Sequence, residues 1–229
     1  IKYVFFSRLD PDHRSHNKSK IKLHPKKIRV FKNICKQSGK NFYKYFYIKK
    51  KSNDIFISSK LATSKDFYTC NKKKKWITNS YSRKRVHLLR STHDAILTTS
   101  KTILEDNPIL NCRIRGFEKF SPKRFIIDKS LNVPLNYNII KTSKNIETFI
   151  FYHYPNKKKI DKLKSLNIKA IKIELTDNHL NFDKIIEILR KKGISRVFIE
   201  AGVNFNNFLI ENNYINDFYH FYSNEIYKN

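Results

Sequence analysis

Short apolar runs alternate with amphipathic and polar segments along most of the chain. Runs of apolar and β-branched residues predict buried strands, whereas apolar residues spaced three and four apart predict helices with one buried face. Strands are expected at residues 1–6, 28–31, 54–61, 95–97, 124–128, 147–153, 168–173, 197–199 and 218–222. Helices are expected at residues 33–47, 78–93, 157–166, 182–192 and 205–212.

This order of elements predicts an α/β fold with a mostly parallel central sheet and helices on both faces, because parallel strands need crossover connections. Thr78 is a plausible N-cap for the helix at 78–93. Gly193 is a good stop for the helix at 182–192. The charged, serine-containing segment 49–53 predicts a connector. We therefore expect two domains, residues 1–51 and residues 52–229.

The segment 94–113 organises the second domain. Its apolar run ends in three hydroxyl residues, 98–100, and the carboxyl end of a buried strand is where α/β proteins place ligands. Thr102 and Glu105 have the spacing of a capping box, and Pro108 disfavours helix at the residue before it. An ordinary junction between a strand and a helix explains the same pattern.

Five blocks in order resemble the reductase half of the bacterial bifunctional riboflavin-biosynthesis deaminase/reductase. The longest, TILEDNPIL at 102–110 followed by Arg113, resembles the family's T-V-L-x-D-[DN]-P-x-L and arginine. The other four are KLATSKD at 60–66, WIT at 76–78, LR at 89–90 and IEAG at 199–202. The resemblance covers about residue 55 to the end.

The resemblance implies a dihydrofolate-reductase-like fold and an oxidoreductase that uses NADPH. Its substrate would be 5-amino-6-(5-phosphoribosylamino)uracil, whose ribosyl group is reduced to the ribityl product. The family is also dimeric, so a homo-oligomer is expected. The fold normally continues beyond the point that corresponds to Tyr222, so we expect the last edge of the sheet to be truncated here.

Matching positions give the expected site residues. Catalytic roles are expected for Glu200 and Lys60. The resemblance places substrate contacts at Lys74, Arg90, Leu110, Arg113 and Glu200. For the two arginines the chemistry agrees, because a planar guanidinium can bind two phosphate oxygens at once. Cofactor contacts are expected from Ala62, Trp76, Thr102, Asp106, Gly202, Val203, Asn204, Phe205 and Asn206. Gly202 precedes a predicted helix, whose N-terminal N–H groups favour an anion.

Several positions depart from the family pattern. Phe67 replaces a usual glycine, and it would be strained if that glycine has a positive φ. Lys74 stands where a serine is frequent and Val203 where a proline is usual. Asn204 and Asn206 replace small residues and would either donate to phosphate or crowd it.

Residues 1–51 would be the C-terminal remnant of the deaminase half. That half needs H-x-E and P-C-x-x-C for its zinc site, and neither pattern occurs in the chain. We therefore expect no zinc, no other metal and no deaminase activity. The chain begins with Ile1 and contains no methionine, which suggests a fragment or a processed form.

The net charge of +29 raises two further possibilities. A basic nucleic-acid-binding module is one, although no recognised nucleic-acid motif occurs and biased codon usage is the favoured explanation of the abundant lysine. A degenerate reductase that keeps the fold without turnover is the other. No apolar run is long enough for a membrane span, and three cysteines without close spacing suggest a reducing, cytoplasmic location.

Overall fold

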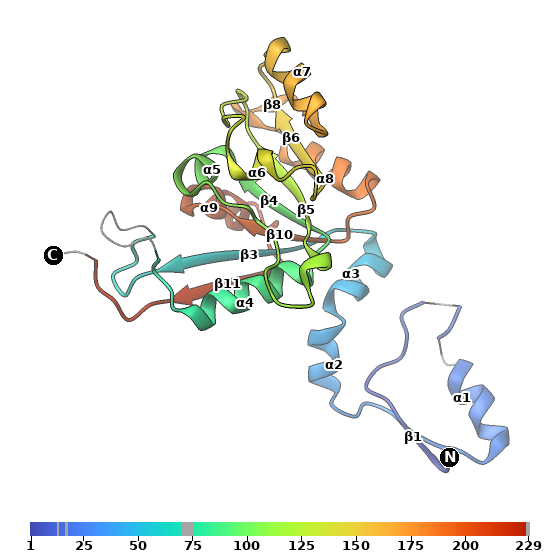
Figure 1. The fold of residues 1–229 in the computed structure, drawn as a ribbon. Coiled ribbons are helices and arrows are strands. Elements are labelled where there is room, and N and C mark those ends of the chain that lie inside the picture. Colours follow the sequence, from blue (N-terminus) through green and yellow to red (C-terminus); the bar gives the residue numbers. More distant parts are fainter. Residues whose placement is uncertain (13, 17, 70–75, 228–229) are drawn as a thin grey trace. The chain divides into compact units, whose positions relative to one another are not determined.

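A seven-stranded sheet forms the centre of Ile57–Asn229, the longer of the two units into which the chain divides (Figure 1). The computed structural model describes residues 1–227 except 13, 17 and 70–75. The division at Phe56 lies a few residues beyond the boundary expected at 51.

The strand order is β11-β3-β10-β4-β5-β6-β7. The chain starts next to one edge with β3, builds outward through β4 to β7 at the other edge, and returns with β10 between β3 and β4 and β11 at the first edge. The strands are β3 (Phe56–Thr63), β4 (Ala95–Thr99), β5 (Lys123–Ile127), β6 (Thr148–Tyr152), β7 (Ile168–Lys172), β10 (Arg196–Glu200) and β11 (Asp217–Tyr222). β10 runs parallel to β4, β11 to β3, and the series from β4 to β7 is parallel throughout. The predicted parallel α/β sheet is confirmed.

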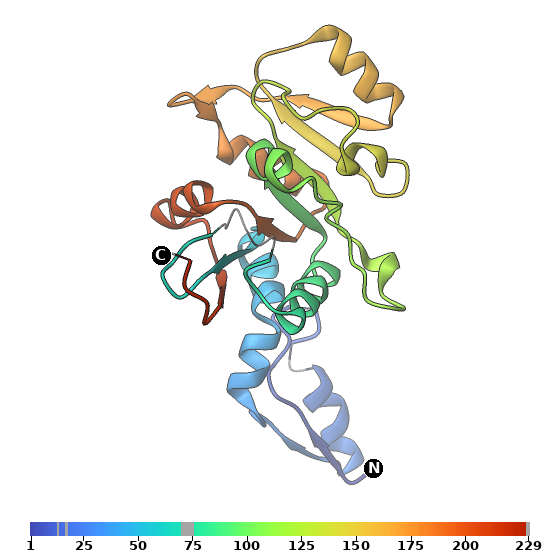
Figure 2. The same ribbon diagram turned by 60° about the vertical axis from the view of Figure 1, so that its left-hand side comes forward.

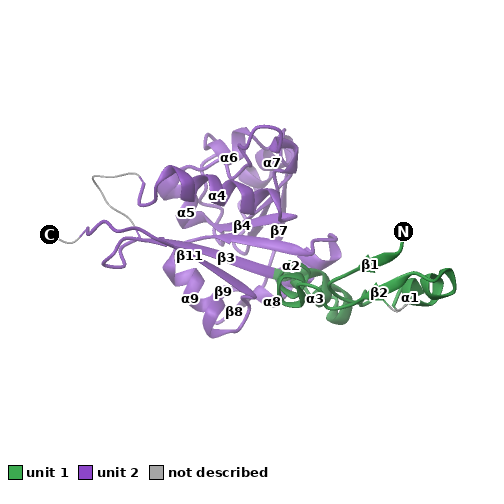
Figure 3. Ribbon diagram, turned by 90° about the horizontal axis from the view of Figure 1, so that it is seen from below, with its two compact units in different colours: residues 1–56 green, residues 57–229 purple. Residues whose placement is uncertain are grey.

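Helices cover both faces of this sheet (Figure 3). One face carries α4 (Ser80–Ser91), α5 (Ser100–Asp106), α6 (Asn138–Lys141) and α7 (Lys157–Ser165). The other carries α8 (Phe182–Lys191) and α9 (Val203–Glu211). α7 lies alongside β6 and β7 in the yellow and orange part of Figure 2. A short hairpin of β8 (Leu175–Thr176) and β9 (His179–Leu180), together with the 3-10 turn η2 (Glu118–Phe120), was not expected.

Two predicted helix starts were placed wrongly. Asn79 caps α4, because its side chain accepts the Ser82 N–H at 2.9 Å, and Thr78 precedes the cap. Thr99 caps α5 by accepting the Thr102 N–H, so Thr102 lies inside the helix and is not its cap. Gly193 follows α8 with φ of 76°, as expected for a residue that ends a helix.

Alternate residues of the strands fill two apolar layers. Ile96, Ile126, Ile150 and Phe198 face α4, α5 and α7, and their cluster includes Leu89 and Ile103. The odd-numbered residues of β5 and β6 form the opposite layer, where Phe125 and Phe149 stack with ring centroids 4.5 Å apart. The two layers fix the register of the strands, because a shift by one residue would turn the apolar side chains outward.

Ile1–Phe56 is a separate, smaller unit. It contains a parallel pair of strands, β1 (Tyr3–Phe5) and β2 (Arg29–Phe31), with the helices α1 (Lys18–Leu23), α2 (Lys36–Phe42) and α3 (Lys44–Ser52) and the 3-10 turn η1 (His24–Lys26). The helix predicted at 33–47 is broken at Tyr43 rather than near Gly39. Gly39 is needed for packing, because a Cβ there would overlap Ser7.

α3 continues to Ser52, so the predicted connector at 49–53 is mostly helical. In the part of the chain that the structure describes, no helix is long and apolar enough to cross a bilayer.

Candidate functional site

A two-pronged ion pair joins α4 to the carboxyl end of β10. Arg90 Nε donates to Glu200 Oε1 at 2.5 Å, and Arg90 Nη2 donates to Glu200 Oε2 at 2.9 Å. Both side chains are buried. The third guanidinium nitrogen, Nη1, donates to the carbonyl of Asn111 at 3.0 Å. Thr98, at the end of the neighbouring strand β4, donates its hydroxyl to the Glu200 carbonyl at 2.7 Å.

The charges around Glu200 keep it ionised. Burial raises the pKa of this carboxyl, but the charge and hydrogen bonds of Arg90 outweigh that effect, and Lys60 and His87 lower it further. Lys60 lies on β3, the strand next to β10. The structure thus joins Arg90 of α4 to Glu200 at the carboxyl end of β10, and it places Lys60 of the adjacent strand within electrostatic reach of Glu200. The carboxyl ends of parallel strands are where α/β folds bind ligands.

The loop after α5 brings Arg113 within electrostatic reach of Glu200. Leu110 has a positive φ of 55° while its side chain is buried in the core, so the chain turns sharply there. The carbonyl of the next residue, Asn111, then meets Arg90 and also His87, whose Nδ1 lies 3.1 Å away. Arg113 is exposed and its Nη1 donates to Asn111 Oδ1 at 3.2 Å. Burial lowers the pKa of Arg113, the charge of Arg90 lowers it further, and the charge of Glu200 opposes both effects.

Two expected cofactor residues lie on α5, directly after β4. Thr102 is half-buried, and its hydroxyl lies 3.2 Å from that of Thr99. Asp106 is the exposed last residue of the helix, one turn further along. A hydroxyl and a carboxylate spaced four apart on one helix lie on the same face.

The start of α9 offers backbone N–H groups beside the end of β10. Gly202 is the N-cap and has no side chain to satisfy them. A Cβ built on Gly202 would meet nothing within 4 Å, so the space in front of this turn is open. Helix N-termini with that geometry accept anionic oxygens.

Asn206 supports this turn from behind. Its Nδ2 donates to the carbonyls of Ala201 at 2.9 Å and Gly202 at 3.1 Å, and its Oδ1 accepts from Ser59 on β3. The side chain is buried and its amide is used within the protein, so it neither donates to a phosphate nor crowds one. It holds the turn in shape. Asn204 is exposed, and Val203 is half-buried. The Phe205 ring packs edge-on against Phe182, with centroids 5.8 Å apart.

The remaining expected residues lie at the carboxyl end of β3 or follow it in the sequence. Ala62 is half-buried close to the end of that strand. Trp76 is exposed, and the Arg83 guanidinium sits 5.1 Å from its ring centroid. Lys74 lies outside the described residues. Phe67 has φ of 63°, which is the strained conformation that its replacement of a glycine had suggested.

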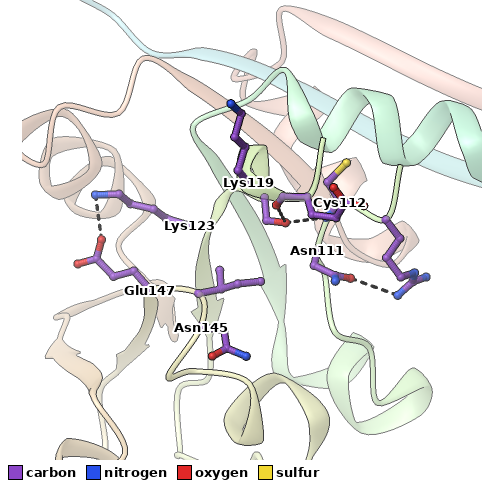
Figure 4. A pocket seen from close by; sticks show the side chains of 10 residues that line it. Asn111, Cys112, Lys119, Lys123, Asn145 and Glu147 are labelled. Atoms are coloured by element: carbon purple, nitrogen blue, oxygen red, sulfur yellow. Dashed lines mark hydrogen bonds and ion pairs between the residues drawn. The ribbon is translucent and has the colours of Figure 1, made fainter. Parts of the chain in front are cut away.

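A pocket of about 560 Å³ lies at the amino ends of β5 and β6 (Figure 4). It is lined by Asn111, Cys112, Arg113, Glu118, Lys119, Ser121, Lys123, Asn145, Ile146 and Glu147. Glu147 is paired with Lys123 at 2.9 Å and with Lys169 at 2.6 Å, so its charge is already compensated. Arg113 and Asn111 line this pocket and also lie near Glu200. The pocket itself is at the amino ends of the strands, not at their carboxyl ends.

Sequence reasoning assigned no role in the site to His87, which lies one turn before Arg90 on α4. Arg90, which was expected to contact substrate, is buried, and His87 is bonded to the 111–113 loop. The signal was present in the spacing, because His87 and Arg90 are three apart and therefore lie on the same side of α4. Among the described residues, no group of three or more histidine, cysteine or acidic side chains is placed to hold a metal ion.

Comparison with known proteins defines the fold first. The chain superposes over its whole length on Acinetobacter baumannii RibD with a TM-score of 0.77 and 22% identity, and it covers 62% of that chain. This likeness, together with the sheet order, confirms the expected reductase-like α/β fold.

The family follows from the sequence comparisons. The family model described as the RibD C-terminal domain matches residues 56–224, and the chain belongs to this family. The riboflavin biosynthesis protein RibD of Bacillus amyloliquefaciens is 30% identical over 205 residues, covering 88% of this chain and 54% of the relative. The 5-amino-6-(5-phosphoribosylamino)uracil reductase of Buchnera aphidicola subsp. Acyrthosiphon pisum is 32% identical over 154 residues, covering 62% of this chain and 71% of the relative. The chain spans about half the length of the RibD proteins it matches.

Proposed function

We propose that the chain catalyses reduction of the ribosyl group of 5-amino-6-(5-phosphoribosylamino)uracil to the ribityl product, with NADPH as the reductant. The observation that carries this proposal is the buried Glu200, fixed by Arg90 and placed within the electrostatic reach of Lys60 and Arg113. A fixed carboxylate beside several cations suits a polar, phosphorylated sugar. The name of the Buchnera relative supports the same reaction.

The residues present fit a nicotinamide dinucleotide. Gly202 leaves open space at the start of α9, a helix long enough to favour a phosphate at its N-terminus. We assign the N–H groups of 203–206 to the pyrophosphate, with Asn206 holding the turn. Thr102 and Asp106 would contact the rest of the nucleotide, together with Ala62 and Trp76. When bound, the cofactor supplies the hydride.

The side chains of the chain itself hold the sugar and manage its charge. Reduction adds a hydride to the anomeric carbon and a proton to the ring oxygen, and the bond between those two atoms breaks. We assign Lys60 to stabilise the charge that develops on that oxygen, and Glu200 to bind sugar hydroxyls. Of the two arginines expected to contact substrate, Arg113 is the exposed one. Its guanidinium would bind the substrate phosphate, with Lys74 as a second cation. Arg90 serves mainly to hold Glu200, because its donors are already engaged.

The smaller unit takes no part in this site in our proposal. We interpret 1–51 as the remnant of a deaminase-like domain, and we expect a homodimer on the family pattern. The superposition on A. baumannii RibD covers 100% of this chain, which supports a relationship that includes the smaller unit.

A direct assay tests the proposed function. Purified protein is mixed with NADPH and the aminouracil substrate, and loss of NADPH absorbance is followed beside identification of the ribityl product. Substrate-dependent oxidation is expected, with NADPH preferred over NADH because its extra phosphate meets a very basic surface. Tight NADPH binding without turnover would instead favour the degenerate reductase. Phe67, in a strained conformation where the family usually has glycine, is the feature that supports this alternative.

A further inference from the structure

His87 lies on the third turn of α4 and faces the loop that carries Arg113. Its Nδ1 is 3.1 Å from the Asn111 carbonyl oxygen and 3.3 Å from the Arg113 backbone nitrogen. The ring is half-buried. Its Nδ1 therefore lies within hydrogen-bond distance of the backbone on both sides of Cys112.

One ring nitrogen cannot serve both partners at once. When Nδ1 carries a proton it donates to the Asn111 carbonyl, and when it is bare it accepts the Arg113 N–H. A neutral ring can alternate between these two bonds, because either tautomer satisfies one of them. A doubly protonated ring keeps only the bond to Asn111 and meets the Arg113 N–H with a like charge.

The surroundings of His87 favour the neutral ring. Burial lowers its pKa, and the charges of Arg90 on the same helix and Arg113 on the facing loop lower it further, against smaller opposing effects of the Asn111 bond and Glu200. Arg90 is committed to Glu200 and to the Asn111 carbonyl, whereas Arg113 is exposed. The exposed guanidinium thus stands on a short backbone segment that His87 fixes.

We propose that His87 is a positioning residue for the anionic end of the substrate, holding the 111–113 backbone so that Arg113 presents its guanidinium to a phosphate group. This inference rests on the proposed function for the identity of the substrate. It concerns a sugar phosphate, however, and can be tested by binding alone.

Ribose 5-phosphate is the probe, titrated into the intact chain at pH 7.5, with NADPH titrated separately. His87→Ala should weaken ribose 5-phosphate binding about five- to tenfold, the usual effect of losing one backbone-anchoring hydrogen bond. His87→Gln should return the affinity to within about twofold of the original protein, because its amide supplies one donor and one acceptor. NADPH affinity and melting temperature should stay unchanged in both variants.

Arg85→Ala is the matched control. Arg85 is exposed on the same helix, and its removal takes away a full charge, whereas neutral His87 carries none. If the basic surface merely attracts anions, Arg85→Ala should weaken binding and His87→Ala should not. The positioning role predicts the reverse order.

The imidazole signals of His87 give a second readout, followed by nuclear magnetic resonance across pH. A phosphate held by Arg113 cancels one of the charges that lower the His87 pKa, so ribose 5-phosphate should raise that pKa, and Arg113→Ala should abolish the change. An unchanged affinity in His87→Ala, a titration that ignores the ligand, or no binding of ribose 5-phosphate to the original chain would each overturn the proposal. Failure of NADPH oxidation with these binding results intact would count against the proposed function alone.

Discussion

Arg90 and Glu200 are 110 positions apart in the chain, yet they form a two-pronged ion pair in the interior. The pair joins the helix after β3 to the end of β10, and it leaves neither charge facing water. Arg90 and Glu200 therefore have two roles, one in the proposed site and one in the stability of the fold. They take part in the site, and each also depends on the other for a partner inside the protein.

Loss of one member should therefore destabilise the fold. Glu200→Gln removes the negative charge and leaves the buried guanidinium uncompensated, which typically costs about 3–5 kcal/mol. Thermal or urea unfolding should show this as a large drop in stability. Turnover should fall as well, so activity must be measured well below the new melting temperature.

The double variant Arg90→Met with Glu200→Leu separates the two roles. Apolar side chains of similar volume should recover most of the stability, because no charge then remains buried. Activity should stay lost. A double variant as unstable as Glu200→Gln would contradict this account of the pair.

Gly202→Ala should spare the fold and weaken the cofactor. The backbone of Gly202 has φ of −71°, which alanine adopts freely, and the added methyl group would enter open space. That space is where we place the pyrophosphate, so NADPH affinity should drop about tenfold or more, which corresponds to roughly 1.4 kcal/mol. Fluorescence titration beside a melting curve measures both quantities.

Gly193→Ala is the comparison for that experiment. Gly193 has φ of 76°, so alanine there should lower stability by about 1 kcal/mol. It is remote from the proposed cofactor site and should leave NADPH affinity unaltered. Equal cofactor affinities in Gly202→Ala and the original protein would argue against placing the nucleotide at α9.

Phe67→Gly should stabilise the protein. Phe67 has φ of 63° and a largely exposed ring, so the side chain contributes backbone strain of about 1–2 kcal/mol and little burial. Glycine removes the strain but gives the unfolded chain more freedom, so a net gain of about 0.5–1 kcal/mol is expected. Asn213→Gly is the control, because asparagine tolerates its φ of 57° and the change should be near neutral.

Acid should destabilise the larger unit through His93. Burial lowers the pKa of this histidine to about 4; its Nδ1 lies 2.6 Å from the Leu89 carbonyl and its Nε2 lies 3.0 Å from the Ser58 hydroxyl. The unfolded chain takes up a proton near pH 6.5, before the folded chain does. Stability contributed by the neutral ring is thus complete above pH 6.5 and is lost as pH falls toward 4, by about 3 kcal/mol in all.

Urea unfolding between pH 4 and 8 measures this slope. His93→Gln keeps an acceptor for Ser58 and cannot titrate, so its stability should vary less with pH over the same interval. His87 also has a lowered pKa and adds its own dependence, which the comparison of the two proteins removes. Parallel curves for the variant and the original chain would rule out His93 as the cause.

The sequence predicted the layers of the fold better than its details. Buried strands such as 95–97 and 197–199 are apolar throughout, so their place in the middle of a parallel sheet follows from composition. Helix starts at Thr78 and Thr102 were wrong because neighbouring Asn79 and Thr99 are equally good caps, and only the backbone geometry decides between them. The hairpin of β8 and β9 is too short to leave a periodic pattern.

The spatial grouping of some candidate site residues was predictable where a motif contained them. Glu200, Arg90 and Lys60 were named from their neighbours in the sequence, and the structure brings them together. No local sequence pattern predicts that Arg90 donates its hydrogen bonds to Glu200, because that contact joins segments far apart in the sequence. His87 and Asn206 act through backbone atoms of other residues, and such bonds depend on three-dimensional placement.

The hydrogen bond from Ser59 to Asn206 has a mechanical consequence. Ser59 immediately precedes Lys60 on β3, and Asn206 grips the turn at Gly202. We therefore expect thermal displacements of the lysine backbone and of the turn to be correlated, so that the distance between them varies less than either position does. Transfer between two bound molecules depends steeply on their separation, so the relative precision of the two holders matters more than the rigidity of either.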